Sequence, residues 1–125
     1  LVRTEDRLDQ TDPAGLRKII AALRDPSIWP EPSRQTAEFE RLALKEYALA
    51  SRMDVLAARR ALIVKDLRAK RDVASADLRR LAADMARLIR DFESLWRARN
   101  KPSRLRDNLS LMRKAQREAQ RRARK

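Results

Sequence analysis

The spacing of large apolar residues over 75–99 constrains the fold more than any other feature of the sequence. In this segment the large apolar side chains recur at alternating steps of three and four: Leu78, Leu81, Met85, Leu88, Phe92 and Leu95. The adjacent row is filled by Ala82, Ile89 and Trp96. Such steps place all these side chains on one face of an α-helix. The pattern predicts an amphipathic helix that buries this face against other helices.

A shorter helix is predicted to begin at Asp12, which is a good N-cap followed by Pro13 at the first helical position. Its apolar stripe consists of Leu16, Ile19, Ile20 and Leu23. The helix should end at Asp25, because a residue that precedes proline avoids the helical region. Trp29 follows on a proline-rich loop. We expect it to pack on the end of its own bundle rather than on a partner.

A long helix is predicted between these two, from Ser33 or Thr36 to about Arg71. Its main apolar row consists of Phe39, Leu42, Leu49, Met53, Leu56, Ile63 and Leu67. A second row, formed by Leu44, Ala48, Val55, Ala58 and Leu62, widens this face beyond what a two-stranded coil needs. Ser103 is expected to cap a last helix with Leu105, Leu109 and Met112 on its apolar side.

Composition agrees with an all-α fold. The chain has 125 residues, a single glycine, no segment with convincing period-two alternation, and therefore no predicted sheet. We predict one antiparallel helical bundle of three main helices plus a short N-terminal helix, over residues 12–112. Residues 1–11 should be irregular. Residues 113–125 should form a basic C-terminal tail that frays or is held by a partner.

Several kinds of chemistry are disfavoured by residue content. The chain contains no cysteine and no histidine, which excludes disulfides and Ser-His or Cys-His catalysis and argues against a zinc site. Acids of the 75–99 helix have a cation three or four residues away, as at Asp84, Asp91 and Glu93. We therefore predict no catalytic, metal-binding or cofactor-binding residue. The chain has no long apolar run and no signal-like start, so we expect a cytoplasmic protein without a membrane partner.

The charge is concentrated near the C-terminus. The net charge is +13, and residues 101–125 hold ten lysines and arginines against Asp107 and Glu118. The candidate polyanion-binding residues of the tail are Arg113, Lys114, Arg117, Arg121, Arg122, Arg124 and Lys125. Such a tail can neutralise phosphates without contacting bases. It could equally be a solvated terminus or meet an acidic protein, and the chain's few aromatic residues leave little for base stacking.

Residues 95–107, LWRARNKPSRLRD, resemble the C-terminal helical region of one subgroup of glycoside hydrolase family 20, the β-N-acetylhexosaminidases. The matching positions are Leu95, Trp96, Ala98, Arg99, Asn100, Lys101, Pro102, Leu105 and Asp107. The resemblance could extend over residues 25–112, although outside this motif it is generic amphipathic helix. Ser103 and Arg104 stand where the family has two glycines.

The resemblance implies a non-catalytic accessory or assembly domain that packs on a catalytic barrel or a second subunit. The family's barrel and its Asp-Glu pair are not in this chain. Candidate interface or ligand residues are Trp96, Arg99, Asn100, Lys101 and Arg104. From the residues alone, Trp96 should pack in the core and Asn100 should cap the helix, whereas Arg99 is predicted to reach a partner. The alternatives are a nucleic-acid-binding ribonucleoprotein component and a protein adaptor with a basic tail.

Overall fold

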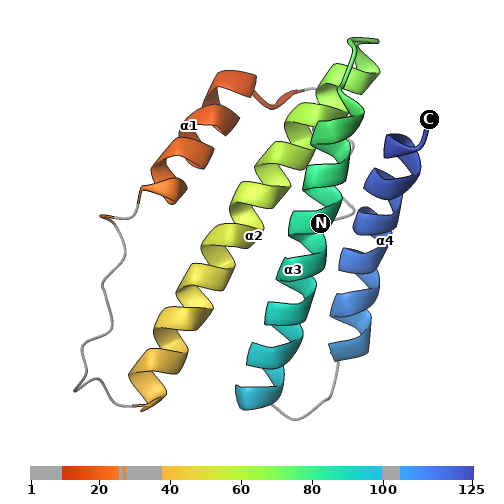
Figure 1. The fold of residues 1–125 in the computed structure, drawn as a ribbon. Coiled ribbons are helices and arrows are strands. Elements are labelled where there is room, and N and C mark those ends of the chain that lie inside the picture. Colours follow the sequence, from red (N-terminus) through yellow and green to blue (C-terminus); the bar gives the residue numbers. More distant parts are fainter. Residues whose placement is uncertain (1–9, 26, 28–37, 100–104) are drawn as a thin grey trace.

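The computed structural model describes residues 10–25, 27, 38–99 and 105–125, and within them the chain forms four α-helices. These are α1 (Pro13–Arg24), α2 (Glu38–Arg68), α3 (Ser75–Arg99) and α4 (Leu105–Ala123). They lie side by side, and successive helices run in opposite directions (Figure 1). The predicted all-α bundle of three main helices and a short N-terminal helix is confirmed.

Helix α1 begins where the sequence predicts and packs along α2. The Asp12 carboxylate accepts hydrogen bonds from the backbone N–H groups of Ala14 and Gly15, at 3.0 and 3.1 Å, and so satisfies two of the unpaired donors at this helix end. Leu16 is buried in a small cluster with Ala58 and Ala61 of α2. Helix α1 therefore covers the side of α2 that faces away from α4 (Figure 1).

Helix α2 ends in a left-handed residue. Lys70 has φ 54°, a conformation that is usually adopted by glycine at a helix C-terminus. The Arg71 N–H donates to the Asp66 carbonyl at 2.9 Å, and the Lys70 N–H donates to the Leu67 carbonyl at 3.1 Å. These bonds close the last turn and direct the chain into the short connection to α3.

The main core lies between α2 and α3, and α4 closes one side of it. The buried members of this cluster are Leu49, Leu56, Leu81, Ala82, Met85, Leu88 and Ala119. Met53, Ile63, Phe92, Leu95 and Ala115 pack against them. Leu81 is the most buried of the large side chains, at 2% exposed. The two apolar rows predicted for α2 and α3 thus supply this core, although the side chain of Phe39 lies outside the described part.

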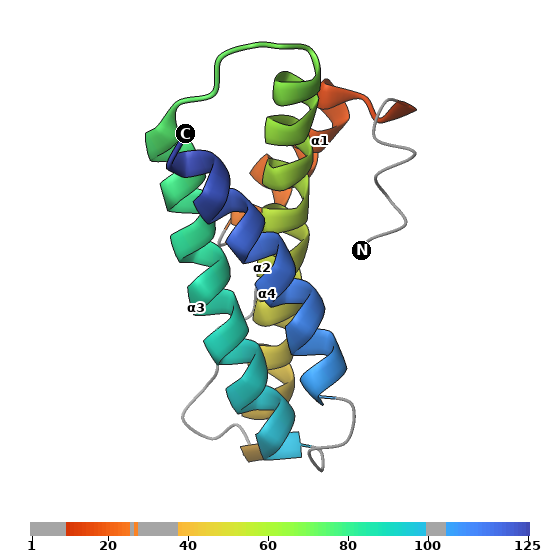
Figure 2. The same ribbon diagram turned by 90° about the vertical axis from the view of Figure 1, so that its right-hand side faces the viewer.

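The last helix is longer than the sequence indicated, because most of the segment expected to fray or to be held by a partner is helical. Helix α4 continues to Ala123, and Ala119 is buried at 6% exposed. Ala115 and Ala119 extend the stripe of Leu105 and Leu109 at helical spacing. Alanines bury little area each, yet they let α4 approach α3 closely. In Figure 2, α4 runs obliquely across the bundle, with its C-terminal end in front of α3 and its earlier part in front of α2.

Some expectations concern residues that the structure does not describe. The loop position of Trp29, the caps at Ser33 or Thr36 and at Ser103, and the C-cap at Asn100 all lie outside the described residues. Within the described ranges, no helix is long and apolar enough to cross a membrane.

Candidate docking groove and basic helix face

A ladder of ion pairs runs along the seam between α2 and α3. The three pairs are Glu46–Arg99, Arg52–Asp91 and Arg59–Asp84, with shortest N–O distances of 2.5, 2.6 and 2.6 Å. The two partners are separated along the chain by 53, 39 and 25 residues in turn. The separation falls by about two heptads at each step, as expected for antiparallel helices. Each of these three carboxylates is therefore paired with an arginine of the facing helix.

Two less exposed carboxylates are held in the ionised state. Burial raises the pKa of Asp84, but hydrogen bonds from Arg59 and Arg87 outweigh it and lower the pKa below its usual value. Burial likewise raises the pKa of Glu118, and hydrogen bonds from Arg60 and Arg122 lower it by more. A general acid needs a raised pKa instead.

A metal ion would need several ligating side chains close together. The described residues contain no group of three or more acidic side chains that could hold a metal ion. The paired carboxylates among them contact arginines, either on a neighbouring helix or on the same helix.

Trp96 and Arg99, the two candidate residues of the 95–107 motif that the structure describes, both contact side chains of this chain. Trp96 stacks on Phe92 with ring centroids 5.5 Å apart and packs in a cluster with Ile89 and Leu105, so its expected place in the core is confirmed. Arg99 donates two hydrogen bonds to the carboxylate of Glu46, at 2.5 and 2.8 Å. Its role at an interface stays a prediction. Lys101 and Arg104, like Asn100, lie outside the described residues, so the structure places only Trp96 and Arg99 of the five candidates.

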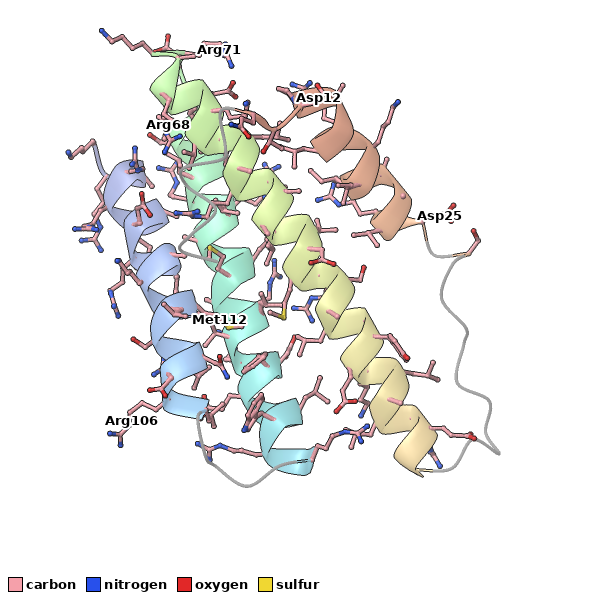
Figure 3. The ribbon with its side chains drawn as sticks, turned by 180° about the vertical axis from the view of Figure 1, so that it is seen from behind. Asp12, Asp25, Arg68, Arg71, Arg106 and Met112 are labelled. Atoms are coloured by element: carbon pink, nitrogen blue, oxygen red, sulfur yellow. The ribbon has the colours of Figure 1, made fainter. Side chains whose placement is uncertain are left out.

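An apolar groove runs between α2 and α4, with α3 as its floor. Its volume is about 340 Å³. The lining residues are Met53, Leu56, Ala57, Arg60, Met85, Leu88, Leu111, Met112, Lys114, Ala115, Glu118 and Arg121. All three methionines of the chain are among them. Figure 3 shows Met112 on the side of α4 that faces the bundle.

The rim of this groove is basic. The Arg60 guanidinium of α2 donates to the Glu118 carboxylate of α4 at 3.1 Å and so joins the two walls. Lys114 and Arg121 line the same groove from α4 and have no ion pair among the described residues. Leu111, also on α4, is 46% exposed. The groove therefore combines uncovered apolar surface with uncompensated positive charge.

A second surface lies on the outer side of α3 and α4. Helical spacing places one row of arginines along each helix: Arg79, Arg90 and Arg97 on α3, and Arg106, Arg113, Arg117 and Arg124 on α4. A shallow hollow between the rows is lined by Arg79, Ala82, Ala83, Ala86, Gln116, Gln120, Ala123 and Arg124. Glu93 contacts Arg97 at 2.5 Å and Arg113 at 3.9 Å. We call these two rows the basic face, and Figure 3 shows Arg106 projecting away from the bundle.

The cations of the predicted polyanion-binding tail therefore lie on more than one surface of the protein. Lys114 and Arg121 border the groove, and Arg122 pairs with Glu118 at 3.0 Å. The basic face takes the remaining arginines of the predicted set: Arg113, Arg117 and Arg124. Lys125 follows the end of α4. Sequence reasoning treated these cations as one tail because it did not extend the helix beyond Ala115.

The groove itself was not predicted. All three methionines lie on predicted apolar stripes, and periodicity alone cannot tell whether a stripe is fully covered by its neighbours. No family model, curated protein or solved structure matches the chain.

Proposed function

We propose that this chain is a non-catalytic helical assembly domain that packs on another protein, in the manner of the accessory helical region of a β-N-acetylhexosaminidase. The apolar groove between α2 and α4 is the observation that carries the proposal. A closed bundle would cover Leu111, Met53 and Met112 on all sides, whereas here they line an open trough. Exposed apolar surface rimmed by polar groups is typical of protein interaction sites.

The assignment to a hexosaminidase rests on the motif at residues 95–107. In this proposal the hydrolytic carboxylates belong to a barrel domain or to a second subunit. The contribution of this chain is to stabilise and position that partner. Arg99, although it contacts Glu46, stays a candidate for an interface because its side chain is 33% exposed.

Purification from the native source tests this proposal in two steps. Size-exclusion chromatography with mass spectrometry should find the chain joined to, or associated with, a larger protein. That assembly should hydrolyse a chromogenic N-acetylhexosaminide, and the isolated 125-residue chain should not. A native protein that is monomeric and consists of this chain alone would refute the assembly role. A stable assembly without this activity would refute the hexosaminidase assignment and leave the assembly role standing.

A second candidate function is nucleic-acid binding, and the basic face is the observation that favours it. Its two rows of guanidinium groups can donate to phosphate oxygens on both sides of the Ala- and Gln-lined hollow. Binding to an RNA duplex should then weaken steeply with salt, because each neutralised phosphate releases counterions.

Charge-neutralising variants test this second function. Replacing Arg79, Arg117 and Arg124 with glutamine should weaken RNA binding at least tenfold, as measured by fluorescence anisotropy. A matched variant that replaces Arg17, Lys18 and Arg24 of α1 removes the same charge elsewhere and should bind almost normally. Equal losses in both variants would show that net charge alone is responsible and would remove this function.

A further inference from the structure

We propose that the groove between α2 and α4 binds an acidic amphipathic α-helix of the partner protein. The inference rests on the proposed assembly function and specifies what that function recognises. Three independent features of the groove support it: the helical walls that line it, its methionine-rich lining and the sign of its rim charges.

The walls of the groove extend far enough to contact a helix over several turns. On α2 the lining residues recur at helical steps, from Met53 through Leu56 to Arg60, and the α4 wall runs from Leu111 to Arg121. Ten residues of helix correspond to a trough about 15 Å long, or about three helical turns. A partner helix laid in this trough would contact both walls and rest its apolar side on Met85 and Leu88 of α3.

The lining is chemically suited to such a partner. Met53, Met85 and Met112 come from three different helices and meet in this groove. Methionine is unbranched and polarisable, so it adapts its shape to large apolar side chains of different outline. Grooves that accept the apolar face of an amphipathic helix commonly use this property.

The rim charges select an acidic partner. Lys114 and Arg121 have no ion pair among the described residues, and both border the groove. The nearby acid, Glu118, is already neutralised by Arg60 and Arg122. Glutamates or aspartates that flank the apolar face of the partner would therefore meet cations, whereas lysines there would meet like charge.

The experiment uses two helical peptides of about 15 residues, with the same leucine and methionine face and either glutamate or lysine on the polar face. Fluorescence anisotropy against the full chain should show the glutamate peptide binding at least tenfold more tightly. Replacing Lys114 and Arg121 with glutamate should reverse this preference and leave the melting temperature almost unchanged. Equal binding of the two peptides, no binding of either, or an unreversed preference would overturn the inference.

Two control variants locate the bound peptide. Replacing Arg117 and Arg124 with glutamate changes the same charge on the basic face and should preserve the preference for the glutamate peptide. Leu111→Ser should weaken binding at least fivefold, because it removes apolar contact from the α4 wall. If the basic-face variant abolishes binding and Leu111→Ser does not, the peptide binds the basic face by charge alone, and the inference is wrong.

The groove could instead be covered by a second copy of this chain. Sedimentation equilibrium would then show a dimer that Leu111→Ser dissociates, and this result would also overturn the inference. The proposed function is tested separately. If the native assembly persists both in the Lys114/Arg121 double variant and in Leu111→Ser, the assembly role stands and its interface lies elsewhere.

Discussion

Truncation of Leu81 is the sharpest perturbation of the fold. This side chain is 2% exposed and packs between α2 and α4 in the main core. Leu81→Ala removes three buried carbons, each contributing about 0.8 kcal/mol of transfer free energy, or about 2.4 kcal/mol together. The cavity that remains adds to this loss. We therefore expect the free energy of unfolding to fall by about 3–4 kcal/mol.

Urea unfolding, followed by circular dichroism and by tryptophan fluorescence, measures this loss. Leu111→Ala is the matched control, because it removes the same atoms from a side chain that is 46% exposed. The control should lose less than about 1 kcal/mol. If Leu81→Ala costs no more than Leu111→Ala, then α3 does not bury the face assigned to it, and the packing described above is wrong.

Three further predictions concern helix ends and ion pairs. Lys70→Gly should raise the free energy of unfolding by up to about 1 kcal/mol, because glycine adopts the observed φ of 54° without a steric cost. Urea unfolding measures this change, and a lower free energy of unfolding in the variant would show that Lys70 is not strained. A double-mutant cycle on Glu46 and Arg99 should give a coupling below about 1 kcal/mol, since their side chains are 35% and 33% exposed; a larger coupling would indicate a desolvated pair. The pKa values of Glu118 and Asp84 lie below their ordinary 4.5 and 3.8 in the folded protein, so their stabilisation is complete above those values and is lost as the pH falls through the folded pKa values. The melting temperature should therefore fall as the pH is lowered, and Glu118→Gln should reduce this fall. An equal dependence of the melting temperature on pH in the variant would contradict the prediction.

Most of the fold follows from patterns that are visible in the sequence. The steps of three and four over residues 75–99 predict α3, and the cap at Asp12 predicts the start of α1. The full length of α4 was not predicted, because Ala115 and Ala119 were not recognised as a continuation of the apolar stripe. An alanine pattern gives a weak signal, yet small side chains are what allow α4 to pack closely on α3.

The ion pairs show a second limit of sequence reasoning. Asp91 was assigned to a cation on its own helix, but it contacts Arg52 of α2 at 2.6 Å. Asp84 contacts Arg87 on its own helix, as expected, and also Arg59 across the seam. The spacing of charges along one helix cannot reveal partners on another until the register of the two helices is known. That register depends on how the apolar rows interlock.

The groove marks a third limit. Met53, Met85 and Met112 lie on apolar stripes like those of a closed core. Whether such a stripe is covered depends on the angle between α4 and α2, which is set by the packing of Ala119 and Leu109 on α3. Local sequence carries little information about that angle, so the groove could be found only in three dimensions.

Methyl NMR of the three methionines tests the central claim most directly. Every methionine of the chain lines the groove, so selective labelling gives signals that report on this site without interference from other regions. On formation of the native assembly, or on addition of the glutamate-faced peptide, we expect the methyl signals of Met53, Met85 and Met112 all to shift. Signals that stay unchanged while the chain is demonstrably bound would contradict the account, because the partner would then occupy a different surface.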